Sequence, residues 1–220
     1  MCLECISELS LLTGEICARC GSPHSVPECR QSPTDGVSTL YRGAGRCCSD
    51  CKARDMPFAS ARSAVAYRRG AVRMLGAWKE GGTSRLAQVA ARIIAGVVPR
   101  PLSLALTPIP SDRDRVLWRG HDVTRALSQA LAKEWDIPVS QLLRRANGMA
   151  HQKGLDAAER RVNVATAFHA VLSPPASICL IDDVYTTGAT ASAAAAALHN
   201  RAPTTRVQVI TFARAIRRQA

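Results

Sequence analysis

The stretch ICLIDDVYTTGAT, residues 178–190, decides the fold class of this chain of 220 residues. Its first four residues are apolar, which is typical of a strand buried on both faces of a parallel sheet. Two adjacent carboxylates, Asp182 and Asp183, follow this strand directly, although neighbouring acids repel each other and are usually found in solvent. Threonines and a glycine then lead into a run of alanines that favours a helix. The junction therefore predicts a ligand-binding loop between a central strand and a helix.

Strand and helix patterns alternate on both sides of this junction, and with 47% hydrophobic residues the chain can bury a sizeable core. Apolar runs predict strands at residues 63–67, 102–110, 139–143, 177–182 and 206–212. Apolar residues at helical spacing predict helices at residues 71–79, 83–98, 122–135, 156–162 and 189–200. Residues 183–188 are expected to form a loop. This order predicts a parallel α/β sheet flanked by helices.

Ligands of parallel α/β sheets bind beyond the carboxyl ends of the strands, where loops meet helix N-termini. At residues 182–190, backbone N–H groups and threonine hydroxyls would hold a phosphate dianion, and Gly188 would allow its close approach. Asp182 and Asp183 would accept hydrogen bonds from the vicinal hydroxyls of a sugar, or hold the water of Mg²⁺. The site differs from a P-loop, because no G-x-x-x-x-G-K-[ST] is present. The stretch predicts a sugar-phosphate site, and the alternative is a surface turn capped by acids and threonines.

Eight of the nine cysteines lie within the first 51 residues, which predicts a cysteine-rich module at residues 1–57 in front of a larger domain at residues 58–220. Three C-x-x-C knuckles are present: Cys2 with Cys5, Cys17 with Cys20, and Cys48 with Cys51. Two knuckles complete the tetrahedral shell of four sulfurs that Zn²⁺ prefers. In a reducing compartment a metal site is favoured over disulfides. The module is therefore expected to be a small zinc ribbon.

The sequence allows two alternative sets of four zinc ligands. The first combines the second and third knuckles, and it leaves Cys2 and Cys5 as half of a second site. The alternative set combines the first and second knuckles, and His24 or Cys29 could replace a ligand in either set. Residues 31–46 are rich in Gly, Ser, Thr and Pro and are expected to form a loop between the knuckles.

The formal net charge is +12, from 29 Lys and Arg residues against 17 Asp and Glu residues. This charge favours a phosphate-bearing partner, either a nucleotide or a nucleic acid. Nearly all the cations are arginines in an alanine-rich chain, a bias that the base composition of a gene also produces. No segment approaches the roughly 18 apolar residues of a membrane span, and the N-terminus lacks the features of a signal peptide. The chain is therefore expected to be cytoplasmic.

The stretch LIDDVYTTGAT at residues 180–190 resembles the signature of type I phosphoribosyltransferases. Further positions, in their order along the chain, resemble the ComF family, the competence-associated phosphoribosyltransferase-like proteins with an N-terminal double zinc ribbon. These positions are the cysteine knuckles, Tyr67, Lys79, the Pro-Ile-Pro turn at residues 108–110, Arg119, Gly120, Gln152, Leu155, Arg160, Asn163, Ala167 and Phe168. The chain departs from the family in having three knuckles where four are common, and His121 and Asp122 where Phe and Asn are usual.

The resemblance implies that the chain binds 5-phosphoribosyl-1-pyrophosphate (PRPP) together with Mg²⁺, and that its zinc is structural. It implies that Asp182 and Asp183 contact the ribose hydroxyls. It also implies that the following residues surround the 5-phosphate: Thr186, Thr187, Gly188, Ala189 and Thr190. The residues implied on the pyrophosphate side are Pro108, Arg119, Gly120 and Lys79. Arg119 and Lys79 are also explained as solvated surface charges, and no catalytic residue is assigned.

Three functions fit these patterns. The first is phosphoribosyl transfer from PRPP to an unidentified nucleophile by a ComF-type protein that acts in DNA uptake. The alternative is a catalytically inactive protein of the same fold that binds single-stranded DNA and a competence helicase, as the resemblance implies. The low aromatic content of 4% argues against a base-stacking platform, whereas the basic charge argues for phosphate contacts. A purely structural zinc adaptor is disfavoured by the intact loop.

Overall fold

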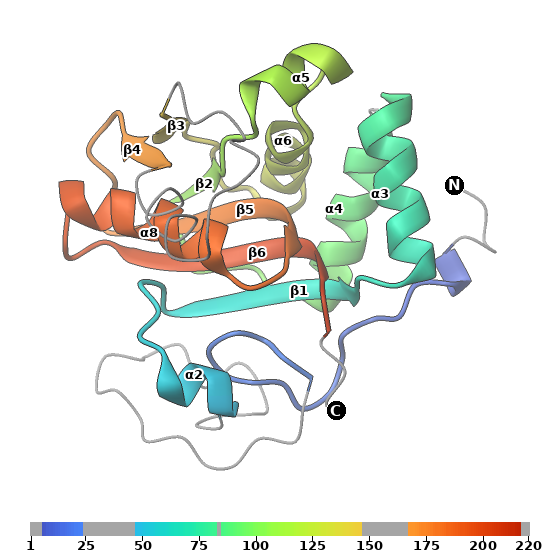
Figure 1. Ribbon diagram of the computed structural model, residues 1–220, viewed down its shortest axis with the longest axis horizontal. Coiled ribbons are helices and arrows are strands. Elements are labelled where there is room, and N and C mark those ends of the chain that lie inside the picture. The colour runs from blue at the N-terminus through green and yellow to red at the C-terminus, as the bar shows by residue number, and fades with distance from the viewer. Residues whose placement is uncertain (1–5, 24–46, 83–84, 147–166, 217–220) are drawn as a thin grey trace, which may run out of the picture.

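The computed structural model describes residues 6–23, 47–82, 85–146 and 167–216 (Figure 1). Its centre is a parallel sheet of four strands in the order β1-β6-β5-β2. These strands are β1 (Ser60–Ala66), β2 (Ala105–Pro108), β5 (Ser177–Tyr185) and β6 (Arg206–Arg214). A second, antiparallel sheet pairs β3 (Leu143–Arg145) with β4 (Phe168–Ala170). The predicted parallel α/β sheet is confirmed.

Helices flank the sheet on both faces, as Figure 1 shows. The helices α3 (Arg69–Gly81), α4 (Arg85–Val97) and α6 (Val123–Trp135) share one apolar core with the sheet. The helix α8 (Ala189–Arg201) belongs to the core on the opposite face, together with β3, β4 and the cysteines. Two further helices are short, α2 (Ser49–Ala53) and α5 (Arg113–Arg119).

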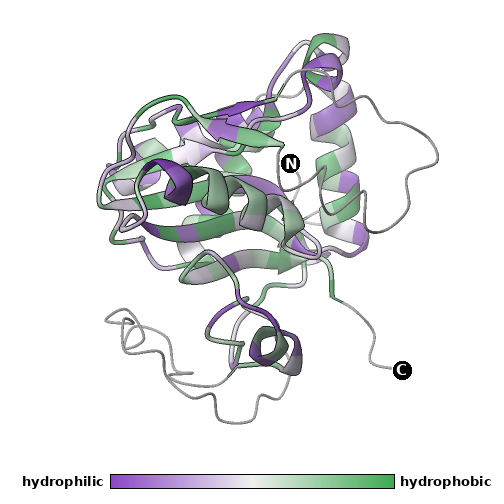
Figure 2. Cartoon of the chain, turned by 60° about the vertical axis from the view of Figure 1, so that its left-hand side comes forward, coloured by the Kyte–Doolittle hydropathy of each residue, from purple (hydrophilic) through white to green (hydrophobic). Residues whose placement is uncertain are grey.

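Strand β5 is central because its side chains alternate between these two cores. Ile178 and Leu180 contribute to the core beneath α8, whereas Cys179 and Ile181 contribute to the core beneath α4 and α6. All four side chains are fully buried, and each large aliphatic side chain contributes roughly 2 kcal/mol by leaving water. Figure 2 shows hydrophobic residues concentrated in the strands and alternating with hydrophilic residues along the helices. The residues that follow Ile181 therefore emerge at a fixed point on the edge of the sheet.

The predicted helices at residues 71–79, 83–98, 122–135 and 189–200 correspond to α3, α4, α6 and α8. The predicted strands at residues 63–67, 102–110, 177–182 and 206–212 correspond to β1, β2, β5 and β6. The helix predicted at residues 156–162 and the loop predicted at residues 31–46 lie outside the described residues.

Two sequence expectations need correction. The strand expected at residues 139–143 is displaced, because Val139 forms an isolated bridge with Leu106 and the strand β3 begins at Leu143. The loop expected at residues 183–188 begins too early, because β5 continues as far as Tyr185, which pairs with Arg214 of β6. Pairing with a neighbouring strand thus extends β5 beyond its apolar run, which periodicity alone does not reveal.

The segment that leads to the second cysteine knuckle lies along the outer edge of β1. Leu12 N–H donates to Ala64 O at 2.8 Å, and Ala66 N–H donates to Ser10 O at 2.8 Å. Such pairing covers the backbone groups that an edge strand would otherwise leave exposed. It also carries the chain directly from the sheet edge to the cysteines, so the cysteine-rich segment is attached to β1 by backbone hydrogen bonds.

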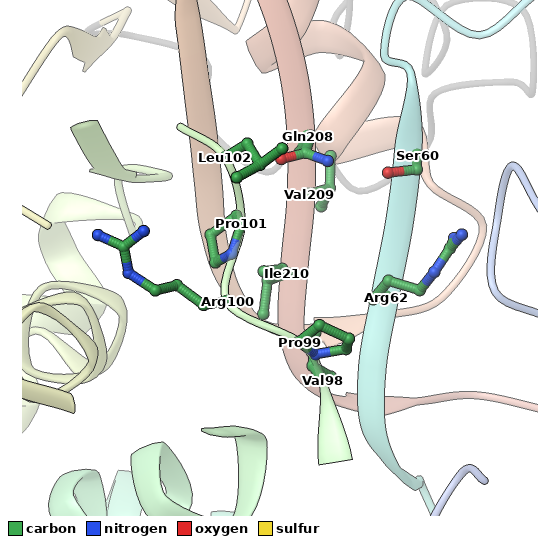
Figure 3. Close-up of a pocket in the computed structure, with 10 residues that line it drawn as sticks. All are labelled: Ser60, Arg62, Val98, Pro99, Arg100, Pro101, Leu102, Gln208, Val209 and Ile210. Carbon is green, nitrogen blue, oxygen red and sulfur yellow. The ribbon is translucent and has the colours of Figure 1, made fainter. Parts of the chain in front are cut away.

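A small pocket lies near the amino ends of β1 and β6, beneath the segment that follows α4 (Figure 3). Its polar lining includes Ser60, Arg100 and Gln208, and its volume is about 30 Å³, which leaves room for a few water molecules at most. The pocket is too small for a sugar phosphate and lies at the end of the sheet opposite the acids. Among the described residues, no helix combines the length and the apolar character needed to cross a membrane.

Candidate functional site

Asp182 and Asp183 lie near the carboxyl end of β5, where the strand leaves the core. Each carboxylate accepts a hydrogen bond from the backbone N–H of the next residue. The distance from Asp183 N to Asp182 Oδ1 is 2.9 Å, and that from Val184 N to Asp183 Oδ1 is 2.8 Å. Lys79 of α3 forms an ion pair with Asp183. These contacts fix two partly buried carboxylates side by side.

The electrostatics of this pair favour a ligand that brings donors or positive charge. Burial raises the pKa of Asp182 well above its usual range, and the negative charge of Asp183 raises this pKa further. The N–H of Asp183 and the charge of Lys79 act in the opposite direction but do not offset the burial. Sugar hydroxyls or a hydrated cation at this position would relieve the repulsion between the two acids.

The structure brings the Pro-Ile-Pro turn to the same end of the sheet as the acids. Pro108 of β2 is the parallel neighbour of Ile181, the residue before Asp182. Ile109 N–H then donates to Ile181 O at 2.9 Å. The turn at residues 108–110 therefore lies next to the acids, because β2 ends opposite Ile181, one residue before Asp182.

Arg119 and Gly120 are placed near Lys79 by His121, for which the sequence predicts no role. His121 Nε2 lies 2.9 Å from Trp78 O in α3, and His121 Nδ1 lies 3.0 Å from Arg119 O. This histidine therefore holds the end of α5 against the last turn of α3, next to Lys79. The Arg119 Nε is buried and has no hydrogen-bond partner in the described part of the chain. An unpaired buried donor of this kind is suited to an anion.

The threonine loop that follows β5 forms the N-terminus of α8. Gly188 is the N-cap residue, with a left-handed φ of 81° that glycine adopts without strain. Thr186, Thr187 and Thr190 are exposed, and Ala189 N–H donates to Thr187 Oγ1 at 3.3 Å. The first turn of α8 carries no acid. The N–H groups of this first turn and the three exposed hydroxyls can therefore receive a phosphate.

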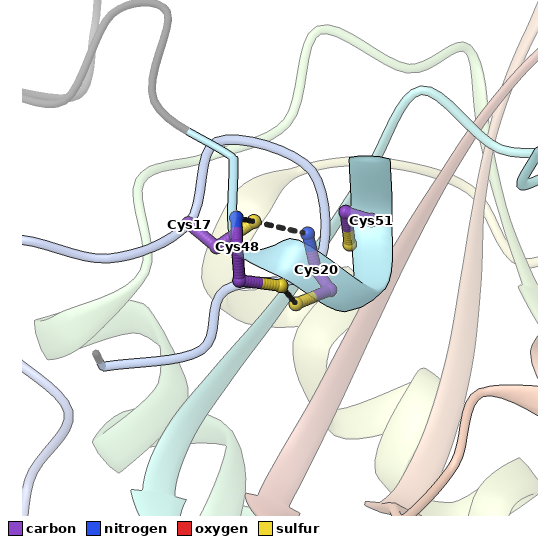
Figure 4. Close-up of side chains that lie close together, drawn as sticks. All are labelled: Cys17, Cys20, Cys48 and Cys51. Atoms are coloured by element: carbon purple, nitrogen blue, oxygen red, sulfur yellow. Dashed lines mark hydrogen bonds between the residues drawn. The ribbon is translucent and has the colours of Figure 1, made fainter. Parts of the chain in front are cut away.

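Four cysteines form a second cluster on the opposite side of β1 from α3 (Figures 1 and 4). The sulfurs of Cys17, Cys20, Cys48 and Cys51 all lie within 4.8 Å of one another. The distance from Cys20 Sγ to Cys48 Sγ is 3.7 Å, close to the roughly 3.8 Å edge of a tetrahedron with Zn–S bonds of about 2.3 Å. The donor set and its spacing therefore fit a zinc ion.

Backbone donors already point at these sulfurs. Cys48 N–H donates to Cys17 Sγ at 3.3 Å, and Cys20 N–H donates to the same sulfur at 3.5 Å. Hydrogen bonds from the thiols of Cys20 and Cys51 lower the pKa of Cys17, which favours the thiolate that a metal requires. The structure thus brings together the second and third knuckles, whereas Cys2, Cys5, His24 and Cys29 lie outside the described residues.

The described residues thus define an α/β protein that carries an acid–threonine loop and a four-cysteine cluster compatible with a zinc ribbon. No family model matches the chain. The chain is similar to Competence protein F of Haemophilus influenzae, with 33% identity over 118 residues. This match covers 51% of the chain and 52% of the relative, so the chain spans about half the length of the curated relative. The similarity agrees with the resemblance of the sequence motifs to the ComF family.

Proposed function

We propose that the chain is a PRPP-binding, phosphoribosyltransferase-like protein of the ComF type that acts in DNA uptake during competence. The observation that carries this proposal is the acid pair near the end of β5, with the threonine loop at the N-terminus of α8 starting three residues after Asp183. This arrangement offers acceptors for a sugar diol and donors for a phosphate at adjacent positions. The similarity to Competence protein F supports the link to competence.

In this proposal Asp182 and Asp183 accept hydrogen bonds from the ribose hydroxyls. The N–H groups of the first turn of α8 and the hydroxyls of Thr186, Thr187 and Thr190 hold the 5-phosphate. The turn that begins at Pro108 and the backbone at Gly120 face the pyrophosphate. Both segments lie at the carboxyl edge of the sheet, within reach of one extended ligand.

The implied chemistry is displacement of pyrophosphate at C1 of the ribose. The bond from C1 to the pyrophosphate oxygen breaks, its electron pair leaves with the pyrophosphate, and a lone pair of the acceptor forms the new bond to C1. Mg²⁺ supplies charge neutralisation of the pyrophosphate when it is bound. Once ribose hydroxyls engage the acids, the leaving oxygens interact with the ammonium of Lys79 and with the Nε–H of Arg119, which has no partner among the described residues.

Thermal unfolding with and without PRPP and Mg²⁺ tests the proposal. At a ligand concentration of roughly 100 times Kd, a ligand that binds only the folded state stabilises it by about 2.7 kcal/mol. For a chain of this size the melting temperature should rise by about 5 °C or more. Ribose 5-phosphate should give a smaller rise, because it lacks the pyrophosphate. An unshifted melting curve at millimolar PRPP would contradict the proposal, and pyrophosphate release with candidate acceptors then separates an enzyme from a binding protein.

A second function, binding of single-stranded DNA, is favoured by the surface of α5. No residue of this helix is buried, and Trp118 and Leu117 are 78% and 69% exposed. Arg113 and Arg115 belong to the same helix. An exposed indole can stack on a base while neighbouring guanidinium groups contact phosphates. The helix therefore combines the two contacts that sequence-independent binding of single strands requires.

Fluorescence anisotropy with a labelled oligothymidine tests this second function. Trp118→Ala should weaken binding by the roughly 1–3 kcal/mol typical of one stacked base. The protein should keep its stability, because this side chain lies mainly in solvent. Leu104→Ala, a change at another exposed apolar residue, serves as the matched control. Affinity should fall steeply with salt. Equal binding by the Trp118 variant and the wild type would assign DNA contact to another surface.

A further inference from the structure

Two arginines, both only 8% exposed, donate hydrogen bonds to the second cysteine knuckle. Arg62 of β1 donates to Ala18 O at 2.8 Å. Arg214, the last residue of β6, donates to Cys20 O at 2.6 Å and to Cys20 Sγ at 3.3 Å. Buried guanidinium groups are costly unless a negative charge compensates them. Four thiolates around one Zn²⁺ carry a net charge of −2, which two arginines balance.

Arg214 also contacts Tyr185, which lies two residues after Asp183. Its guanidinium carbon lies 4.5 Å from the centroid of the Tyr185 ring, and the two residues are partners in the pairing of β5 with β6. Tyr185 is only 4% exposed. Ala215 N–H donates to Tyr185 O at 2.9 Å, which fixes the backbone of the two strand ends together. The same guanidinium therefore contacts a cysteine sulfur and the aromatic ring at the end of β5.

Tyr185 in turn supports the threonine loop. Its hydroxyl lies so close to Gly188 that a Cβ atom at this position would overlap the oxygen. Gly188 is the N-cap of α8, the position around which the proposed phosphate site is built. The residues Cys20, Arg214, Tyr185 and Gly188 thus form one continuous series of contacts from the cysteine cluster to the loop.

We propose that Arg214 and Tyr185 couple the two sites, so that occupancy of the cysteine cluster sets the conformation of the threonine loop. With metal bound, the thiolate of Cys20 fixes the position of the Arg214 guanidinium. The guanidinium in turn fixes the Tyr185 ring, and this ring packs against Gly188 of the loop. Without metal, Arg214 loses its charged acceptor and the support of the loop is released. Arg214 is a positioning residue, because it acts on the loop through Tyr185. Coupling between two sites is reciprocal, so a change at the loop must alter metal retention.

A double-mutant cycle on metal retention tests this coupling without any ligand of the loop. The rate of zinc transfer from the purified full chain to a chromogenic chelator is measured for Gly188→Ala, Arg214→Lys and the double variant. Gly188→Ala drives a methyl group against Tyr185 and should speed transfer by about fivefold or more. In the Arg214→Lys background, the same change should add less than about twofold, because the flat guanidinium that transmits it is gone.

Arg62→Lys is the matched control, because Arg62 holds the same knuckle from β1 through the carbonyl of Ala18. It should speed zinc transfer on its own, and the effect of Gly188→Ala should persist in full beside it. Where Gly188→Ala does not fold, as judged by circular dichroism, Tyr185→Leu replaces it in the same cycle. Independent effects of the loop and Arg214 substitutions, multiplying in the double variant, would overturn the inference.

A second experiment, which rests on the proposed function, adds PRPP with Mg²⁺ to the same zinc-transfer assay. The ligand should slow zinc transfer from the wild type by about fivefold or more, and it should have little effect on Arg214→Lys. Calorimetry on the same samples keeps two failures apart. If PRPP does not bind, the proposed function fails, and the mutant cycle still decides the coupling. If PRPP binds and zinc transfer is unchanged in the wild type, the coupling is refuted and the proposed function stands.

Discussion

At the scale of single residues, Asp182 lies in a buried position that lowers the stability of the folded protein. Burial and the charge of Asp183 raise its pKa, so the folded protein keeps this proton to a higher pH than the unfolded chain does. The folded state then binds more protons than the unfolded state. The free energy of unfolding therefore falls as pH rises from about 3.9, the ordinary value for Asp, through the raised pKa. A carboxylate kept at such a cost is typical of a functional site.

Asp182→Asn should stabilise the protein at pH 7. The amide oxygen can still accept from the N–H of Asp183, while the penalty for a buried charge is removed. The free energy of unfolding at pH 7 should therefore be higher in the variant than in the wild type. The gain should shrink as pH is lowered towards 4. Urea denaturation over this pH range measures it, with the fully exposed Asp55 changed to Asn as control. A loss of stability at pH 7 would contradict this account of Asp182.

Several residue-scale contacts could not be predicted from the sequence. The acids, the threonines and the cysteine knuckles were found because their spacing within one segment carries the chemistry. The contact of Arg214 with Tyr185 depends on the register between β5 and β6, which no local pattern fixes. The only sequence signal for Arg214 is a charged residue at the end of an apolar strand. His121 likewise acts through the carbonyls of Trp78 and Arg119, and backbone acceptors leave no trace in the sequence.

At the scale of elements, the predictions succeeded where apolar residues recur with a clear period. The helices α3, α4 and α6 each bury such residues in a core, whereas α8 is predicted by its run of alanines, which favours a helix without a clear apolar period. The helix α5 was missed because none of its residues is buried and its seven residues carry no apolar stripe. The short strand β3 was predicted in a displaced position and β4 was not predicted, because their pairing with each other defines these strands rather than their composition.

The four-cysteine cluster yields the prediction that belongs to this scale. Freshly purified, reduced protein should contain about one zinc ion for each complete set of four cysteines. Cys48→Ser should lose the ion, because Cys48 supplies one of the four clustered sulfurs. Cys47→Ser is a matched control, since Cys47 is a buried neighbour outside this set. Elemental analysis measures the zinc. Zinc retained by Cys48→Ser and lost by Cys5→Ser would favour the alternative set that includes the first knuckle.

At the scale of the whole molecule, the parallel sheet places two chemically different sites on either side of one strand end. The acids lie near the end of β5 and the threonines follow this strand, whereas the cysteine cluster packs in the core beneath α8 together with Tyr185. Alternation of strands and helices predicted the parallel sheet. The order β1-β6-β5-β2 was not predictable, because it depends on which edges the helices leave open. The division into a module at residues 1–57 and a domain at residues 58–220 remains a prediction.

The central claim is that Asp182 and Asp183 bind the sugar of a phosphorylated ligand, and isothermal titration calorimetry with PRPP and Mg²⁺ tests it most directly. The wild type, the double variant Asp182→Asn with Asp183→Asn, and the control Asp55→Asn are titrated under identical conditions. We expect the double variant to bind about 10- to 150-fold more weakly, because a hydrogen bond to a charged group contributes about 1.5–3 kcal/mol. The control should match the wild type. Equal affinity of the double variant and the wild type for PRPP would contradict the claim.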